Sequence, residues 1–135
     1  MGTPDIRWKQ RFQNFEKAFA RLEHAIIVVK KEPDNEVLTA GLIQTYEFTF
    51  ELAWKTLKDY LEMEGFDVPS PRSTIRQAFQ SGYIHNAEDW MQALNDRNLT
   101  THTYDDQIAA KVIGDINEKY FFILQELYLY LKAEL

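Results

Sequence analysis

Residues 35 to 63 form a long stretch that is apolar on more than one side of a helix. One row at the three- and four-residue spacing of a helix consists of Tyr46, Phe50, Ala53, Leu57 and Leu61. Phe48, Leu52 and Trp54 lie off this row, so little polar surface remains for a helix packed on one side only. No alternation of period two is sustained, which argues against a strand. We therefore expect a helix that is covered by its own bundle and by a second chain.

Two other long segments show the same helical spacing. The first spans about residues 5 to 31, and its apolar stripe consists of Phe12, Phe15, Phe19, Leu22, Ile26 and Val29. The last spans about residues 104 to 132, and its stripe consists of Ile108, Val112, Ile116, Tyr120, Ile123, Leu127 and Leu131. After the first segment, "EPDN" combines a proline with cap-forming side chains and ends the helix. Because this connection is short, the first two helices should run antiparallel.

Two shorter segments lie between the long ones. The loop "EGFDVPSPRS" contains a glycine and two prolines, and a short helix should follow it over about residues 73 to 80, closed by Gly82. Another helix should run over about residues 87 to 98. Together the segments predict an all-α fold, an up-and-down four-helix bundle with one extra short helix. At this length we expect a single domain over residues 1 to 135.

Composition restricts the classes of function. The formal net charge is −6, so we do not expect a general nucleic-acid binder, which would neutralise phosphates with Lys and Arg. The chain has no cysteine, which excludes disulfides and thiolate metal sites and fits a reducing cytoplasm. The longest aliphatic run, "AIIVV", is too short to span a bilayer, and the N-terminal residues do not resemble an export signal. We expect a cytoplasmic protein without membrane attachment.

Several common kinds of site are not indicated. Five scattered glycines form neither a GxxxxGK[ST] nor a GxGxxG phosphate loop. His24, His85 and His102 are far apart in the sequence, and the pair His85 and Glu88 is better explained as surface residues near a helix start, since zinc needs three or four ligands. No glycine-serine pair precedes paired aspartates, the pattern that holds metal and triphosphate in nucleotidyltransferases. We expect no metal or other cofactor and no nucleotidyltransferase activity in the chain itself.

The stretch "NDRNLTTHTYDD", residues 95 to 106, carries the most reactive combination of side chains. Arg97, His102 and Tyr104 fall within eight residues in a chain with three histidines. An arginine fork can bind a phosphate through two hydrogen bonds, and a histidine can move a proton near neutral pH. The two could cleave a phosphodiester in RNA, with His102 activating the 2′-hydroxyl or protonating the leaving oxygen and Arg97 stabilising the phosphorane-like transition state.

The local helix signals allow a functional and a purely structural interpretation of this stretch. Thr103 and Asp106 have the spacing of a capping box, which would place His102 at the N-terminus of the last helix, where unpaired N–H groups favour a phosphate. In the structural interpretation, Arg97 caps the preceding helix and His102 fills a turn. Spacing alone does not decide between them.

A family resemblance favours the functional interpretation. "RNLTTHTY" resembles the R-x4-6-H motif, in its extended R-x4-H-x-Y form, of the HEPN superfamily of small all-α bundles. The segments "YEFTFELAWKTLKDYL", "SPRSTIRQAFQSGYI" and "W-x6-RNLTTHTYD" are similar to the branch called nucleotidyltransferase substrate-binding proteins. The similarity extends from the first helix to the last.

The resemblance implies a partner and a reaction. Members of that branch associate with a separately encoded minimal nucleotidyltransferase, and in related pairs the HEPN protein is a metal-independent ribonuclease toxin that the transferase silences by adding AMP to the motif tyrosine. Arg97 and His102 would then be the catalytic pair, Asn98 an auxiliary polar residue and Tyr104 the modification site. HEPN proteins commonly dimerise so that two motifs face one cleft. A homodimer or higher oligomer, with RNA or a nucleotide as ligand, is therefore expected.

Charges around the motif act in both directions. Three aspartates flank it and would weaken its attraction for phosphate unless they point away or pair with arginines: Asp96, Asp105 and Asp106. Arg72 and Arg76 of the short helix could restore a positive rim. Glu47 and Glu51 share one face of the apolar second helix, where we expect them to be buried, and an ordinary Glu51–Lys55 contact is favoured over a role in the site.

Two alternatives to a ribonuclease remain open. The chain could be a substrate-recognition or docking subunit without catalysis of its own, which the acidic composition favours. It could also be a helical scaffold with no nucleotide chemistry.

Overall fold

The computed structural model describes residues 4–97 and 105–135, and all regular elements in these two ranges are helices. In chain order they are α1 (Pro4–Lys31), α2 (Glu36–Met63), α3 (Pro71–Gln80), α4 (Ala87–Asp96), α5 (Asp106–Asp115), the π-helical turn η2 (Ile116–Tyr120) and α6 (Phe121–Ala133). The predicted all-α fold class is confirmed. Within the described ranges, no helix is both long and apolar enough to pass through a membrane.

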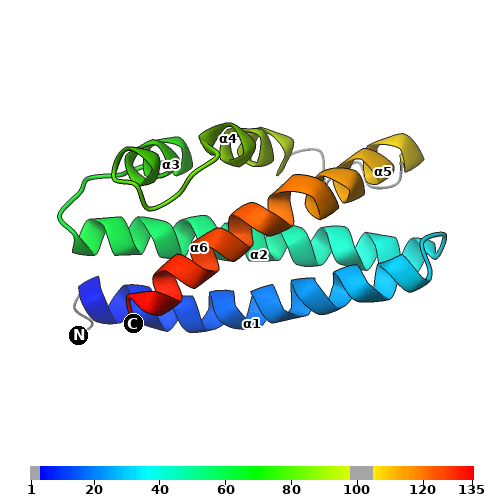
Figure 1. Ribbon diagram of the computed structural model, residues 1–135, viewed down its shortest axis with the longest axis horizontal. Coiled ribbons are helices and arrows are strands. Elements are labelled where there is room, and N and C mark those ends of the chain that lie inside the picture. Colours follow the sequence, from blue (N-terminus) through cyan, green and yellow to red (C-terminus); the bar gives the residue numbers. More distant parts are fainter. Residues whose placement is uncertain (1–3, 98–104) are drawn as a thin grey trace.

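α1 and α2 form a long antiparallel hairpin, as the short connection predicted (Figure 1). Asn35 is the N-cap of α2, because its side-chain oxygen accepts hydrogen bonds from the backbone N–H groups of Val37 and Leu38, both at 3.1 Å. The predicted apolar stripe of α1 and the row from Tyr46 to Leu61 on α2 are buried. The helical spacing of the sequence therefore identified the two facing surfaces of the hairpin.

α3 and α4 lie together on one side of α2 (Figure 1). α3 begins two residues earlier than predicted, at Pro71, because Ser70 caps it and exchanges hydrogen bonds with Ser73 in a capping box. Gly82 closes α3 as expected, with a φ of 79° that suits glycine. The stretch before α4 ends at Asn86, whose φ of 55° is left-handed.

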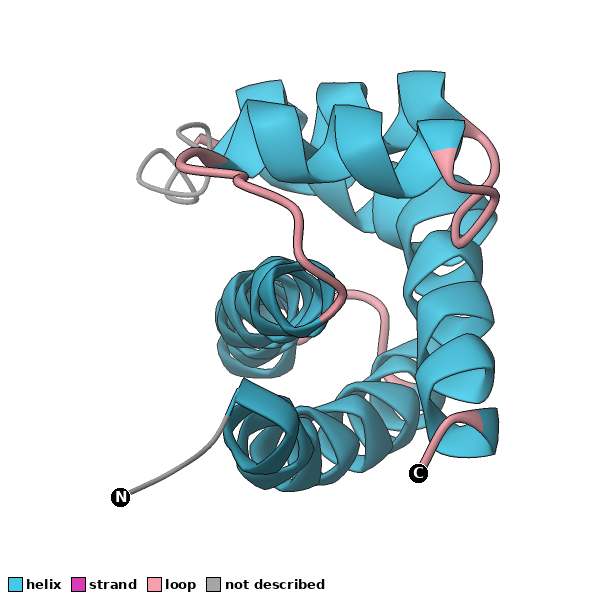
Figure 2. Ribbon diagram, turned by 90° about the vertical axis from the view of Figure 1, so that its left-hand side faces the viewer, coloured by secondary structure: helices cyan, strands magenta, loops and turns pink. Residues whose placement is uncertain are grey.

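α5, η2 and α6 continue one another and cross the hairpin diagonally (Figure 1). Figure 2 shows α6 running along one side of the molecule to the C-terminus. Of the predicted stripe on this segment, Ile108 is half-buried and the other six residues, from Val112 to Leu131, are buried. The core that results is rich in aromatic rings, including Trp8, Phe12, Phe15, Phe50 and Trp90.

The second apolar side of α2 is only partly covered within the chain. Leu52 and Trp54 are half-buried, but Phe48 is 67% exposed. The chain's own bundle therefore leaves the Phe48 ring in contact with solvent. The expectation that a second chain covers this side of α2 stays a prediction.

Candidate functional site

Arg97 is the one residue of the R-x4-H-x-Y motif that the structure describes. Asn98, His102 and Tyr104 lie outside the described residues, as does Thr103. Arg97 follows the last residue of α4 as its C-cap, in the position that the sequence predicted. The surroundings of Arg97 can therefore be analysed directly, while the roles of His102, Asn98 and Tyr104 remain predictions.

A carboxylate on α2 faces the Arg97 guanidinium. Arg97 Nη1 lies 3.5 Å from Glu51 Oε1, and the two side chains are 38% and 36% exposed. The other carboxylate oxygen, Glu51 Oε2, accepts a hydrogen bond from Trp54 Nε1 at 3.0 Å. Lys55 Nζ lies 3.9 Å from the same oxygen. Glu51 thus connects the motif arginine to the outer side of α2.

This contact corrects two expectations about α2. Glu47 is exposed and Glu51 half-buried, so the prediction that both are buried was wrong. The side of α2 that carries Glu47 and Glu51 faces outward, and the chain's own helices do not fully cover it. The expected Glu51–Lys55 pair is present, but it is longer than the Arg97 contact that the sequence did not reveal.

A polar cleft of about 430 Å³ lies beside Arg97. Its lining residues come from the start of α3 and the end of α4, and they are Ser70, Pro71, Arg72, Leu94, Asn95 and Arg97. Arg72 Nη2 donates a hydrogen bond to Asn95 Oδ1 at 3.3 Å, which holds the second arginine on the same cleft. Arg76, one turn further along α3, is exposed and is not among the lining residues. Two guanidinium groups therefore share one opening, which suits a phosphate.

Asp96 is not among the residues that line this cleft, and its partners are on the last helical segment. Its Oδ2 accepts a hydrogen bond of 2.6 Å from the Tyr120 hydroxyl and lies 3.3 Å from Lys111 Nζ. Burial, and then the hydrogen bond to Asp96, raise the pKa of Tyr120 well above its ordinary value, so the hydroxyl remains a donor. This aspartate anchors the end of α4 to the last helical segment and has its charge matched there.

The N-cap of α5 is Asp105 and not Thr103, so the predicted capping box was wrong. The Asp105 carboxylate accepts hydrogen bonds from the N–H groups of Gln107 at 2.9 Å and Ile108 at 3.3 Å. Aspartate at this position also interacts favourably with the positive end of the helix dipole. Because the Asp105 carboxylate accepts hydrogen bonds from these N–H groups, it takes the place of the phosphate that the sequence placed at this helix N-terminus. Arginines remain the better anion ligands.

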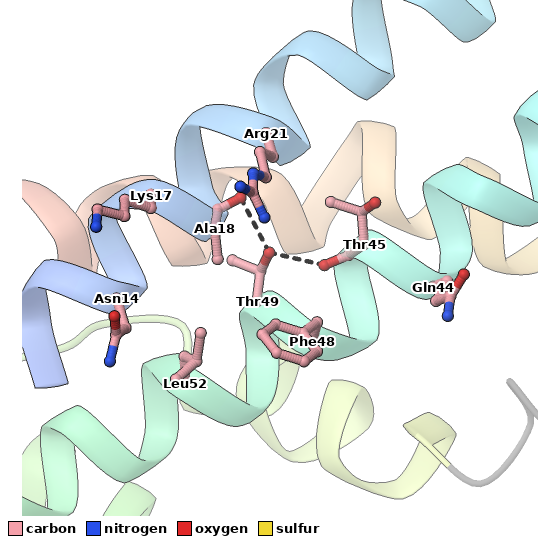
Figure 3. Close-up of a pocket in the computed structure, with 9 residues that line it drawn as sticks. All are labelled: Asn14, Lys17, Ala18, Arg21, Gln44, Thr45, Phe48, Thr49 and Leu52. Atoms are coloured by element: carbon pink, nitrogen blue, oxygen red, sulfur yellow. Dashed lines mark hydrogen bonds between the residues drawn. The ribbon is translucent and has the colours of Figure 1, made fainter.

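The outer face of α2 carries two adjacent hollows. One, of about 450 Å³ between α1 and α2, is drawn in Figure 3 and is lined by Asn14, Lys17, Ala18, Arg21, Gln44, Thr45, Phe48, Thr49 and Leu52. At its floor, Thr49 donates to a backbone carbonyl of its own helix and lies 3.2 Å from that of Ala18 on α1. The other, of about 440 Å³, is lined by Gln44, Glu47, Phe48, Glu51, Leu52 and Lys55. Exposed Phe48 lies between them, and Glu51 links this face to Arg97.

No metal centre was predicted, and the described ranges contain no group of three or more histidine, aspartate or glutamate side chains placed to hold an ion. The polar side chains that line the cleft beside Arg97 carry guanidinium, amide and hydroxyl groups.

Comparisons with known proteins agree with the predicted resemblance. Residues 10–133 match the family described as "Nucleotidyltransferase substrate binding protein like". A Haemophilus influenzae protein named "Probable ribonuclease HepT" is 28% identical over an alignment of 126 residues, and the alignment covers 82% of this chain and 86% of that protein.

Two solved structures are similar to the fold. A Haemophilus influenzae structure, described as revealing the fold of a substrate binding domain of a nucleotidyltransferase, is 25% identical with a TM-score of 0.79, and the similarity covers 90% of this chain and 98% of that one. A crystal structure from Thermus thermophilus is 32% identical with a TM-score of 0.74, covering 84% of this chain and 94% of that one.

Proposed function

Because the chain belongs to the nucleotidyltransferase substrate binding protein like family, we propose that it is a HEPN-type subunit that binds a separately encoded minimal nucleotidyltransferase. We further propose that it is the ribonuclease toxin of such a pair. The name of the Haemophilus influenzae relative, "Probable ribonuclease HepT", supports this activity. The observation that carries the proposal is that Arg97, the first residue of R-x4-H-x-Y, shares a cleft with a second arginine, Arg72.

The proposed reaction needs no metal. His102 removes the proton of a ribose 2′-hydroxyl, the 2′-oxygen forms a bond to phosphorus, and the bond from phosphorus to the 5′-oxygen breaks as that oxygen takes up a proton. Arg97 stabilises the negative charge that grows on the phosphoryl oxygens, and Arg72 holds the substrate phosphate in the cleft. Asn98 is an auxiliary polar residue, and Arg76 extends the positive rim.

The test is RNA cleavage in the presence of EDTA. We expect the wild-type chain to cleave, and Arg97→Ala and His102→Ala each to lose about 100-fold or more in rate, as is usual for removal of an acid–base or electrostatic group. Arg7→Ala and His85→Ala are matched controls, since both residues are exposed and lie outside the cleft. If the wild type cleaves no faster than the two site variants, the ribonuclease proposal is wrong.

A homodimer completes the proposed site by bringing two motifs to one cleft, so that one histidine can act as base and the other as acid. Exposed Phe48, between the two hollows of α2, supports a second copy on this face. Phe48→Glu should therefore convert a dimer to a monomer in analytical ultracentrifugation and lower cleavage. Leu129→Glu is the control, because Leu129 is 59% exposed on α6, away from both hollows. Equal effects of the two variants would contradict this interface.

Tyr104 is the proposed modification site. Its hydroxyl attacks the α-phosphorus of ATP bound to the transferase, a tyrosine–AMP bond forms and pyrophosphate leaves. Mass spectrometry of the chain after incubation with transferase and ATP should show additions of the mass of AMP that disappear in Tyr104→Phe and persist in Tyr83→Phe. Additions that persist in Tyr104→Phe would place the modification elsewhere.

The second candidate function is a docking or substrate-binding subunit without catalysis. The Glu51–Arg97 contact favours it, because a carboxylate already neutralises part of the guanidinium charge. This function predicts that Arg97→Ala and His102→Ala bind the transferase and support its activity as the wild type does, while none of the three cleaves RNA.

A further inference from the structure

Arg97 lies between two environments. On one side it lines the cleft that it shares with Arg72, and on the other its Nη1 faces Glu51 of α2 at 3.5 Å. Glu51 is not among the residues that line the cleft, so the carboxylate approaches Arg97 from outside the cleft. A guanidinium group has five N–H donors in a rigid plane, so one arginine can contact a carboxylate at one edge and still present its other edges in a fixed direction.

The carboxylate that meets Arg97 is itself held in place. Its two oxygens have different neighbours, because Oε1 faces Arg97 whereas Oε2 accepts the hydrogen bond of 3.0 Å from the Trp54 indole. Trp54 is half-buried on α2, one turn after Glu51, so its ring is fixed to a long helix of the hairpin. The two contacts from Trp54 to Glu51 and from Glu51 to Arg97 thus connect the long helix α2 to the arginine at the end of α4.

We propose that Glu51 is a positioning residue that orients the Arg97 guanidinium toward the cleft for a phosphodiester group, with Trp54 fixing the Glu51 carboxylate. This inference deepens the proposed ribonuclease function and rests on it. Long arginine side chains have many rotamers, and a group that must meet a transition state gains from being held before the substrate arrives. The opposite role for Glu51 is that of a competing anion that substrate phosphate must displace.

Steady-state cleavage separates the two roles. For a positioning residue, Glu51→Gln should lower kcat by about 10- to 100-fold, since small misplacements of a catalytic group have effects of this size. KM should change by less than about twofold. If Glu51 is instead a competing anion, Glu51→Gln should lower KM and maintain or raise kcat. Either that result or kinetics unchanged from the wild type would overturn the proposal.

Glu62→Gln is the matched control. Glu62 is on the same helix, is 34% exposed and pairs with Lys58 at 3.1 Å, so the change removes a comparable charge without touching Arg97. Its kinetics and unfolding midpoint should equal those of the wild type. Trp54→Phe removes the donor to Glu51 Oε2 along with part of the ring, and its kcat should fall between those of the wild type and Glu51→Gln. A similar loss of kcat in Glu62→Gln would attribute the effect to the charge of the helix and overturn the proposal.

A spectroscopic measurement tests the contact without any enzymatic activity. The Trp54 indole N–H signal, assigned in ¹⁵N–¹H NMR spectra by its loss in Trp54→Phe, should shift in both Glu51→Gln and Arg97→Ala and stay unchanged in Glu62→Gln. If the wild type does not cleave RNA, the proposed function fails, while these shifts still show whether Glu51 couples Trp54 to Arg97. An unshifted Trp54 signal in Arg97→Ala would overturn the positioning role.

Discussion

Two stacked tyrosines, one of which is hydrogen-bonded to the end of α4, should respond differently to loss of their hydroxyl groups. The rings of Tyr46 and Tyr120 stack with centroids 5.3 Å apart, and both residues are buried. Tyr120 donates a hydrogen bond of 2.6 Å to Asp96, the residue before Arg97. The Tyr46 hydroxyl, in contrast, has no hydrogen-bond partner among the described residues. Changing either residue to phenylalanine keeps the ring and removes only the oxygen.

The expected magnitudes follow from these partners. A hydrogen bond to a charged group contributes about 1.5 to 3 kcal/mol. Asp96 is 20% exposed and keeps its contact with Lys111, so we expect the lower end, a loss of about 1.5 kcal/mol for Tyr120→Phe. For Tyr46→Phe we expect no loss, because an unpaired buried hydroxyl is costly to keep.

Urea unfolding followed by far-ultraviolet circular dichroism measures both changes. With an m value of about 2 kcal/mol per molar urea, Tyr120→Phe should lower the unfolding midpoint by about 0.8 M, and Tyr46→Phe should leave it unchanged or raise it. A midpoint shift for Tyr120→Phe below about 0.2 M, or equal losses in the two variants, would refute the assignment of Asp96 as the anchor of α4.

Two further predictions concern the ends of the last helical segment. Asp105→Ala should lower the free energy of unfolding by about 1 kcal/mol in the same urea assay, because the N-cap bonds are lost, whereas Asp106→Ala should have a smaller effect. Hydrogen bonds from Lys132, and then from Tyr128, hold the pKa of Glu16 below its ordinary value of 4.5. This contribution to stability is present above pH 4.5 and is lost as the pH falls through the lower, folded-state pKa, so Glu16→Gln should flatten the stability profile measured across this acid range.

The helical periodicity of the sequence was sufficient to predict the fold class and the buried faces. It was not sufficient to predict the π-helical turn of Ile116–Tyr120. Successive apolar residues of this stripe are spaced by four from Ile108 to Tyr120, and in a straight α-helix each such step drifts about 40° around the axis. A π turn takes up an extra residue and returns Tyr120 to the buried side, where it reaches Asp96. The repeated spacing of four residues is consistent with a π turn, but we interpreted the segment as a regular α-helix and did not predict the turn.

From the sequence, the candidate site could be predicted only for residues that lie close together along the chain. Arg97 at the end of α4 followed from the motif and the helix pattern. The partner of Arg97 did not, because Glu51 precedes it by 46 positions in the sequence and meets it only through the packing of α4 against α2. The α5 cap was misassigned since both Thr103 and Asp105 are good N-cap residues, and position within the helix, not residue type, decides between them.

The net charge of the chain is −6, but the acidic residues near the motif have their own partners and do not line the proposed phosphate site. Asp96 is matched by Tyr120 and Lys111, and Asp105 by the first N–H groups of α5. Exposed Asp106 lies in the first helical turn, where negative charge interacts well with the helix dipole. The described residues that line the Arg72–Arg97 cleft include no acid. Since screening by salt limits the reach of exposed charges to about 8 to 10 Å, the local pair of arginines matters more to an approaching phosphate than the total charge.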